Sequence, residues 1–241
     1  RTSDGKLLVS CYTKPGQLLY DGKKIISWST DDGLVGDKVR VAIETGPDEY
    51  YVGTTTGLSI IHADGSIKNI RQAEGLETEY VMTVYKDSHG VVWVGTDGGG
   101  IYLIQDEKVI SHITSSYGIA GNVIFKISQD SDNHFWVCTG SGITRIEDFD
   151  ASKSIRFKST TLNSENGLGT NSVFQILFDT TGNAWITNNH GIASISKEEL
   201  EAFYSGKSRT VNTKYYSRND GLDSDGPTST ARSIVDSKGR L

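Results

Sequence analysis

The sequence has little cysteine, no basic cluster and no long apolar run, and each shortage excludes a class of protein. Only Cys11 and Cys138 are present, and we interpret both as small fillers rather than a disulfide or a catalytic thiol. The 24 basic and 30 acidic residues give a net charge of -6, which argues against nucleic-acid binding. No apolar run approaches the roughly 20 residues that cross a bilayer, and residues 1–5 lack the features of a signal peptide.

Familiar catalytic and metal-binding patterns are missing as well. The sequence contains no H-E-x-x-H, G-x-S-x-G, Walker or Rossmann motif, and its five histidines are scattered without metal-ligand spacing. Asp220, Asp223 and Asp225 do not follow the alternating pattern of a calcium loop. We therefore predict no catalytic residue, no metal and no cofactor for this chain.

One phrase recurs along the chain and predicts its fold. Its best copy is Asp87-Ser-His-Gly-Val-Val-Trp-Val-Gly-Thr96. The anchor positions of five copies are 43, 42, 43 and 49 residues apart, and they are Leu8, Tyr51, Trp93, Trp136 and Trp185. A period of this size is typical of the four-stranded blades of a β-propeller. We predict that the five anchors are structural and seal the junctions between stacked blades.

Each repeat has the pattern of a four-stranded antiparallel meander with short turns. We predict an all-β fold with one propeller segment over residues 1–241, whose repeats are approximately 1–32, 33–74, 75–117, 118–166, 167–220 and a partial 221–241. Trp28 falls in an outer strand and should be half exposed. One short helix is expected near 197–205, because Ser196 and Glu199 form a capping box and Gly206 supplies a stop.

Both ends of the sequence fall at turns inside a repeat, at Asp4-Gly5 and within residues 236–241. Two arrangements fit this pattern. The segment can be excised from a larger ring, or its last strand can close onto the first blade to make five blades. We favour excision from a larger ring, because rings usually end at a blade seam.

The repeat resembles the two-component regulator propeller family. The resemblance rests on Gly75-Leu76, Asp87-Ser-His-Gly90, Trp93-Val-Gly-Thr96 and Gly100-Ile101, and on a second signature in 195–207, 215–222 and 236–241. The family has tryptophan at the positions of Leu8 and Tyr51. Asn188 replaces the residue that usually follows the small residue of the repeat. The resemblance implies an extracytoplasmic sensor, in the periplasm or outside the cell, usually built from seven-bladed propellers. An immunoglobulin-like domain, a membrane helix and a histidine kinase or diguanylate cyclase would follow in the parent chain.

A polar rim is expected where the loops leading into the first strands meet the turns after the second strands. Such a rim suits a small polar ligand such as an oligosaccharide. The residues assigned to it are Asp37, Glu79, Tyr80, Asp97, Asn122, Asn171, Asn188, Asn189 and His190. The alternative for the Asp and Asn side chains is that they bond nearby backbone and hold the turns.

Two other functions stay open from the sequence. The carboxylates Asp37, Glu79 and Asp97 could serve a polysaccharide lyase or glycoside hydrolase, although no feature of the sequence indicates perturbed pKa values. The chain could instead be a protein-interaction scaffold, and homodimerisation is one form of this alternative.

Overall fold

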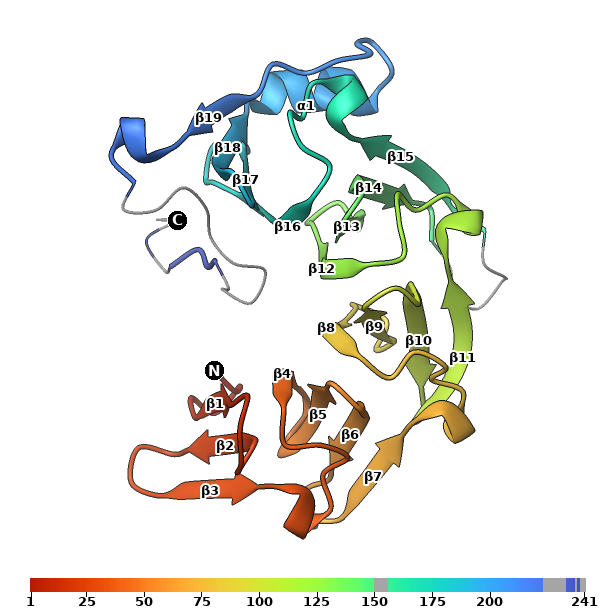
Figure 1. Cartoon of the computed structure of the whole chain (residues 1–241), viewed down its shortest axis with the longest axis vertical. Helices are drawn as coiled ribbons and strands as arrows, with labels where there is room; N and C mark the ends of the chain where they lie inside the picture. The colour runs from red at the N-terminus through yellow and green to blue at the C-terminus, as the bar shows by residue number, and fades with distance from the viewer. Residues whose placement is uncertain (150–155, 223–232, 237, 239–241) are drawn as a thin grey trace. The chain divides into compact units, whose positions relative to one another are not determined.

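The computed structural model describes residues 1–149, 156–222, 233–236 and 238 (Figure 1). Its contacts divide the chain into two compact units, unit 1 (Arg1–Thr114) and unit 2 (Ser115–Leu241), and each is considered by itself below. The described residues include no helix that is both long and apolar enough to cross a membrane.

Unit 1 contains three antiparallel sheets. The first is formed by β1 (Leu7–Ser10), β2 (Gln17–Tyr20) and β3 (Ile25–Trp28). The second consists of β4 (Val39–Gly46), β5 (Glu49–Thr54), β6 (Gly57–Ile61) and β7 (Ile67–Ile70). The third consists of β8 (Val81–Lys86), β9 (Val92–Thr96), β10 (Ile101–Gln105) and β11 (Lys108–Ile113). Strands in each sheet follow one another in chain order, as a meander requires.

Unit 2 contains two sheets of the same kind. One is formed by β12 (Ile124–Gln129), β13 (Phe135–Thr139), β14 (Gly142–Glu147) and β15 (Lys158–Leu162). The other is formed by β16 (Val173–Phe178), β17 (Ala184–Asn188), β18 (Gly191–Ile195) and β19 (Lys214–Tyr216). Helix α1 (Lys197–Tyr204) lies between β18 and β19 in the chain, and its Ser196 cap accepts a hydrogen bond from the Glu199 N–H at 3.3 Å. The predicted all-β fold and its single helix are confirmed for the described residues.

Each full sheet is preceded by a one-turn 3₁₀ helix, which explains the repeated Gly-Leu dipeptide. These turns are η1 (Thr30–Asp32), η2 (Gln72–Glu74), η3 (Ser115–Tyr117) and η4 (Ser164–Asn166), and η5 (Arg218–Asp220) follows β19. Gly75 ends η2 with a φ of +97°, a conformation that favours glycine. The chain then turns inward, and Leu76 is fully buried.

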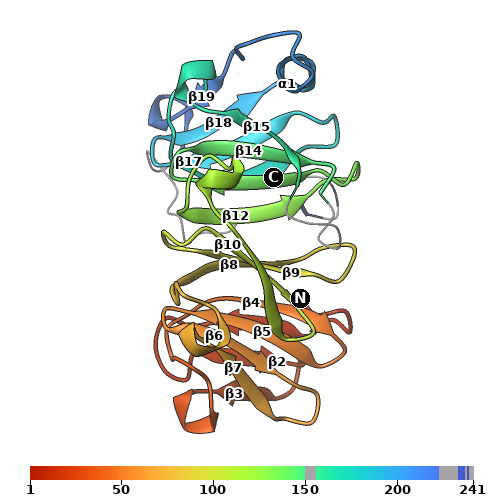
Figure 2. The same cartoon turned by 90° about the vertical axis from the view of Figure 1, so that its right-hand side faces the viewer.

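Within each unit the sheets stack face to face, and in unit 1 the second sheet lies between the first and the third (Figure 2). In unit 1, β1 contacts β4 and β4 contacts β8, whereas in unit 2 β12 and β13 contact β16. Every residue of β6 and β9 is buried. The tight spacing explains a small residue after the anchor: a Cβ on Gly53 would lie 2.4 Å from Val81 Cγ1. Cys138 occupies this position in β13, and its burial raises the pKa of the thiol to about 12.

Both cysteines are free thiols, and the buried Cys138 behaves as the small filler that the repeat predicts. Trp28 is half-buried, also as expected for an outer strand. The first sheet has three strands where the others have four. Its β1 carries the anchor Leu8 and therefore corresponds to β5 and β9, the second strands of the next two sheets.

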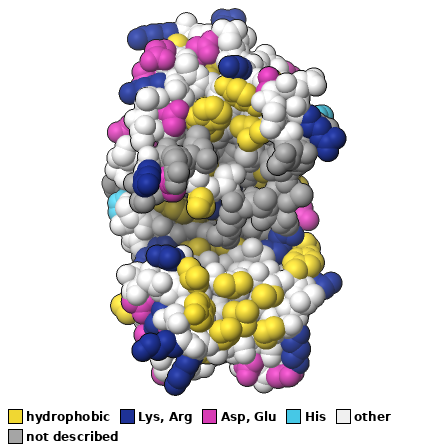
Figure 3. Space-filling model, turned by 90° about the vertical axis from the view of Figure 1, so that its left-hand side faces the viewer, with side chains coloured by type: hydrophobic (Ala, Val, Ile, Leu, Met, Phe, Trp, Pro, Cys, Tyr) yellow, Lys and Arg dark blue, Asp and Glu magenta, His cyan; other side chains and the backbone are white. Residues whose placement is uncertain are grey.

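The first sheet has an apolar face that no described residue covers. Leu7, Val9, Tyr20 and Ile25 share this face, because Leu7 pairs with Tyr20 and Tyr20 pairs with Ile25 across the strands. Their exposed fractions are 38%, 43%, 39% and 65%. Figure 3 shows hydrophobic side chains gathered over this part of the surface. The opposite face carries Leu8 and Leu19, which pack against the second sheet.

The two faces of this sheet should respond differently to mutation. We expect Ile25→Lys to change the free energy of unfolding by less than about 0.5 kcal/mol, because the side chain already lies in solvent. Leu19→Ala on the packed face should cost about 2 kcal/mol or more. Urea denaturation followed by circular dichroism measures both. Equal losses would show that the register of β1–β3 is not the one described.

Candidate ligand-binding surfaces

The repeated tryptophans are held by the aspartate that opens the preceding turn. The indole N–H donates to the carboxylate six residues earlier, from Trp93 to Asp87 at 2.9 Å, from Trp136 to Asp130 at 2.8 Å and from Trp185 to Asp179 at 2.9 Å. The second oxygen of each carboxylate accepts backbone N–H groups two and four residues on. Each aspartate therefore ties the turn to the strand that follows it.

The five anchors differ in burial. Trp93 is fully buried, and Trp136 and Tyr51 are 3% and 5% exposed. Leu8 and Trp185 are half-buried, and Trp185 stacks on Tyr216 with ring centroids 5.6 Å apart. Tyr51 belongs to a core cluster that spans the second and third sheets, and Trp136 belongs to one that spans the two sheets of unit 2.

Four of the predicted rim residues share one structural task. Each accepts the N–H of the residue seven positions earlier, which is the first residue of a 3₁₀ turn. The pairs are Asp37 with Thr30 at 2.8 Å, Glu79 with Gln72 at 3.1 Å, Asn122 with Ser115 at 2.7 Å and Asn171 with Ser164 at 2.8 Å. This is the turn-holding alternative, in which one oxygen of each side chain accepts a backbone N–H.

The remaining rim residues lie at turns between the second and third strands. Asp97 is exposed, and its backbone N–H donates to the Tyr80 carbonyl at 3.0 Å. Asn189 and His190 are exposed, whereas Asn188 is fully buried. The Asn188 Oδ1 accepts the His190 N–H at 2.8 Å, but its Nδ2 has no hydrogen-bond partner among the described residues. Threonine at this position in β5, β9 and β13 donates instead to a glycine carbonyl.

Tyr80 belongs to a group of four side chains in unit 1, which we call the tyrosine–cation cluster: Tyr12, Lys38, Arg40 and Tyr80. Tyr12 lies in the β1–β2 loop, Lys38 and Arg40 lie at the start of the second sheet, and Tyr80 directly precedes β8. The two phenol oxygens are 3.0 Å apart. An Arg40 N–H donates to the Tyr80 hydroxyl at 3.1 Å, and the guanidinium lies 5.4 Å from the Tyr80 ring centre. Lys38 Nζ lies 5.7 Å from the Tyr12 ring centre.

The charge of this cluster is uncompensated. Neither Lys38 nor Arg40 forms an ion pair with a described carboxylate, and the buried Arg40 Nε has no described hydrogen-bond partner. The hydrogen bond with Tyr80 lowers the pKa of the Tyr12 phenol, and Arg40 and Lys38 add to this effect because positive charge favours a phenolate. Three sheets thus bring two cations and two phenols to one place in unit 1.

Sequence reasoning selected Tyr80 but missed its three partners. Lys38 directly follows Asp37, just as Tyr80 directly follows Glu79, so the same alignment shifted by one residue would have found Lys38. Arg40 follows two positions later, near the start of β4. Tyr12 is 68 residues from Tyr80 and carries no repeat signal.

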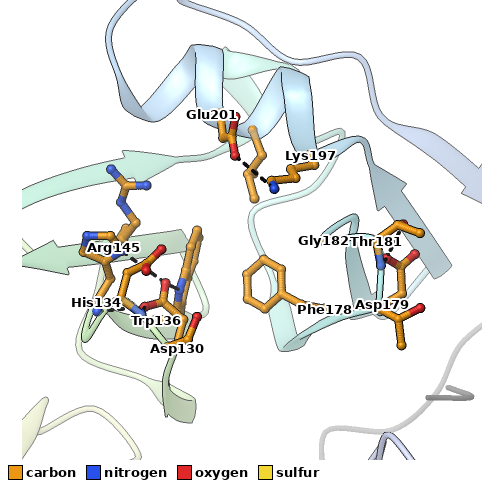
Figure 4. Close-up of a pocket in the computed structure, with 14 residues that line it drawn as sticks. Asp130, His134, Trp136, Arg145, Phe178, Asp179, Thr181, Gly182, Lys197 and Glu201 are labelled. Carbon is orange, nitrogen blue, oxygen red and sulfur yellow. Dashed lines mark hydrogen bonds and ion pairs between the residues drawn. The ribbon is translucent and has the colours of Figure 1, made fainter. Parts of the chain in front are cut away.

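Unit 2 contains a cavity of about 480 Å³ between its two sheets and α1 (Figure 4). Trp136 and Arg145 come from one sheet, Phe178 comes from the other with Asp179 directly after it, and α1 contributes Lys197, Leu200 and Glu201. The β12–β13 turn adds Asp130, Ser131, Asp132 and His134, and the β16–β17 turn adds Thr180, Thr181 and Gly182. None of these residues was predicted as a ligand contact.

Two groups of described residues place three potential metal-ligating atoms within 4.8 Å of one another. Glu49, His62 and Glu107 form one group in unit 1, where Glu107 also pairs with Lys68 at 2.9 Å. Asp130, Asp132 and His134 form the other in unit 2. Asp130 is already occupied by the Trp136 indole and by backbone N–H groups, so this second group follows from the shared turn geometry.

Comparison with known proteins identifies the repeat. Residues 75–98 match the two component regulator propeller family. These residues contain the best copy of the repeated phrase, and the resemblance predicted from the sequence is confirmed. No curated protein matches the chain.

Solved structures with a similar fold include one described as the extracellular domain of a hybrid two component system of B. thetaiotaomicron. It has a TM-score of 0.69 and 21% identity, and the match covers 93% of this chain but only 29% of that one. The virginiamycin B lyase of Staphylococcus aureus has a TM-score of 0.63 and 16% identity, with 82% and 65% covered. PorZ of Porphyromonas gingivalis, a surface component of the type-IX secretion system, has a TM-score of 0.62 and 17% identity, with 87% and 33% covered. These likenesses establish a β-propeller fold.

Proposed function

We propose that this chain is a non-enzymatic, ligand-sensing part of an extracytoplasmic two-component-type receptor, and that it binds a hydroxyl-rich, negatively charged ligand at the tyrosine–cation cluster. The observation that carries the proposal is the pair of cations, Lys38 and Arg40, which have no described carboxylate partner and lie beside two phenols. An acidic saccharide offers what this cluster needs: an anion for Arg40, hydroxyls for the phenols, and an apolar ring face for the exposed Tyr12.

The family match and the likeness to an extracellular sensor domain support the receptor part of the proposal. In such a receptor, ligand binding can change the signalling state only if the bound and free forms make different contacts with the next domain. We propose that an immunoglobulin-like domain and a membrane-linked output domain of the parent protein receive this change, and that the parent forms a homodimer.

The enzyme alternative is less well supported by the geometry. The Glu79 carboxylate accepts hydrogen bonds from the Arg71 side chain and the Gln72 backbone, and these lower its pKa. A carboxyl with a lowered pKa is a poor general acid near neutral pH. Asp37 is likewise occupied by the backbone and side chain of Thr30. The likeness to a lyase supports the fold and no shared chemistry.

Isothermal titration calorimetry with trigalacturonate and the neutral maltotriose tests this proposal. We expect the acidic sugar to bind more tightly, and we expect Arg40→Gln to weaken it by about tenfold or more, because a hydrogen bond to a charged group is lost. Tyr80→Phe should have a smaller effect. Lys24→Gln, which changes an exposed lysine in the β2–β3 turn, is the matched control.

Two results would contradict the proposal. One is the absence of heat with trigalacturonate and with a wider panel of uronate and sulfated oligosaccharides. The other is Arg40→Gln binding as tightly as the unmodified chain. Release of unsaturated or shortened products from these sugars would instead support the enzyme alternative.

A further inference from the structure

We propose that the cavity beneath α1 in unit 2 binds a small organic amine: a protonated ammonium group attached to a flat apolar body. This inference does not depend on the proposed function, because every residue that carries it belongs to unit 2 and none belongs to the tyrosine–cation cluster. At about 480 Å³, the cavity falls within the roughly 300–1,000 Å³ of small-molecule sites.

The apolar wall of the cavity is fixed in place. Trp136 packs against Phe178 and Tyr204, each with ring centroids 5.1 Å away, and its indole N–H is bonded to Asp130. Leu200 of α1 is 6% exposed and lines the same cavity. Figure 4 shows the Phe178 ring between the two turns and below the helix. A wall with this little freedom loses little entropy when a flat ligand packs on it.

The charges around the wall favour a cation. Four carboxylates line the cavity, those of Asp130, Asp132, Asp179 and Glu201, against two permanent cations, Arg145 and Lys197. Burial alone would raise the pKa of Asp179, but hydrogen bonds from Thr181, Trp185 and Asn183 outweigh it and hold the pKa well below its usual range. This carboxylate is therefore charged at neutral pH.

The Arg145 charge is already matched by a residue outside the cavity lining. Its guanidinium forms an ion pair with Glu147 and lies 4.3 Å from the Tyr204 ring centre. The Lys197 Nζ lies 3.7 Å from the Glu201 Oε1. The two side chains form an ion pair, but this distance is longer than that of a hydrogen bond. His134 contacts Asp130 at 3.2 Å and adds a positive charge only when protonated.

Two carboxylates remain to receive an ammonium group. Asp132 is exposed, and its carboxylate has no hydrogen bond or ion pair with any described residue. Glu201 has Lys197 as its one ion-pair partner in the part of the chain that the structure describes. An ammonium near Asp132 or Glu201 could place its apolar body against Phe178, and an aromatic face also attracts a cation. Carboxylate acceptors at the opening and an aromatic wall together define the ligand class.

Three probes of nearly equal size and different charge test the proposal at pH 7.5. They are phenethylamine, 2-phenylethanol and 3-phenylpropanoate, each titrated into the ¹⁵N-labelled chain and followed by amide chemical shifts. We expect saturable shifts with phenethylamine in the β12–β13 turn, the β16–β17 turn and α1. The alcohol should bind at least about threefold more weakly, since it lacks the ion pair.

Isosteric variants locate the charge recognition. Asp132→Asn and Glu201→Gln should each weaken phenethylamine about two- to fivefold, the range of an exposed ion pair. Glu198→Gln removes the same charge from an exposed position on α1 outside the cavity lining and should leave the affinity unchanged. Thermal melts of all three variants show whether any change comes from unfolding.

Three outcomes would overturn the proposal. The alcohol could bind as tightly as the amine, which would make the site merely apolar. The carboxylate could bind more tightly, which would assign recognition to Arg145 and Lys197. The amine could produce no saturable shifts at these turns. None of these results would affect the saccharide experiment on unit 1.

Discussion

Trp93→Ala is expected to lower the free energy of unfolding by about 3–5 kcal/mol, one of the largest losses available in this chain. The Trp93 side chain is fully buried in β9, so its removal leaves a large cavity. It also removes the indole N–H that Asp87 accepts at 2.9 Å, and a buried acceptor without its donor adds to the cost. Urea denaturation followed by circular dichroism measures the loss.

The same substitution at Trp185 is the matched control. Trp185 occupies the same repeat position and makes the same bond to an aspartate, but it is half-buried. We therefore expect Trp185→Ala to cost clearly less than Trp93→Ala. Because the two residues belong to different compact units, amide hydrogen exchange should show which unit loses protection in each variant. Equal losses at both positions would show that the greater burial of Trp93 is not what makes it important.

The sequence predicts the sheets well, because the fold is built from a repeated local pattern. A strand, a turn opened by Asp and closed by Gly, and a second strand recur with nearly constant spacing, and β8–β9 and β16–β17 follow this pattern. Helix α1 was predictable for the same reason, since Ser196 and Gly206 are local signals. Membership of a larger ring and its number of blades stay predictions, as does a single segment over residues 1–241.

The candidate ligand contacts were harder to predict, because side-chain direction depends on one residue of register. The aligned column of Asp37, Glu79, Asn122 and Asn171 faces backward, toward the 3₁₀ turn that precedes each first strand. Lys38 and Tyr80 follow Asp37 and Glu79 directly and belong to the tyrosine–cation cluster, so a shift of one residue exchanges a turn-holding role for a place in that cluster. The repeat identifies the aligned positions, but it does not show which side of the chain would contact a ligand.

Contacts between sheets lie outside what a repeat can reveal. Tyr12 meets Tyr80 only because three sheets stack in unit 1, and the cavity in unit 2 exists only because α1 lies against two turns. The bond from each indole to its aspartate is a different case. An Asp six residues before a Trp occurs in three copies, at 87, 130 and 179, so this spacing was available in the sequence as a sign of contact.

Asp87→Ala tests whether that contact organises the turn, and we expect it to cost about 2–4 kcal/mol. The Asp87 side chain accepts the backbone N–H groups of His89 and Val91, both at 2.9 Å, as well as the Trp93 indole N–H. Its removal takes this acceptor from all three donors, and a buried donor left unpaired costs about 1–3 kcal/mol. Asp87→Asn should cost about half as much, because Oδ1 can still serve the turn while the amide faces the indole N–H.

A second aspartate and a double-mutant cycle separate this effect from a general change in charge. Asp97 is exposed, so Asp97→Ala should stay within about 0.5 kcal/mol of the unmodified chain. Trp93→Phe should cost less in the Asp87→Ala background than alone, because the indole bond is already gone. Equal stability of Asp87→Ala and Asp97→Ala would contradict the argument. A double loss smaller than the sum of the two single losses would show that Asp87 stabilises the protein through its bond to Trp93.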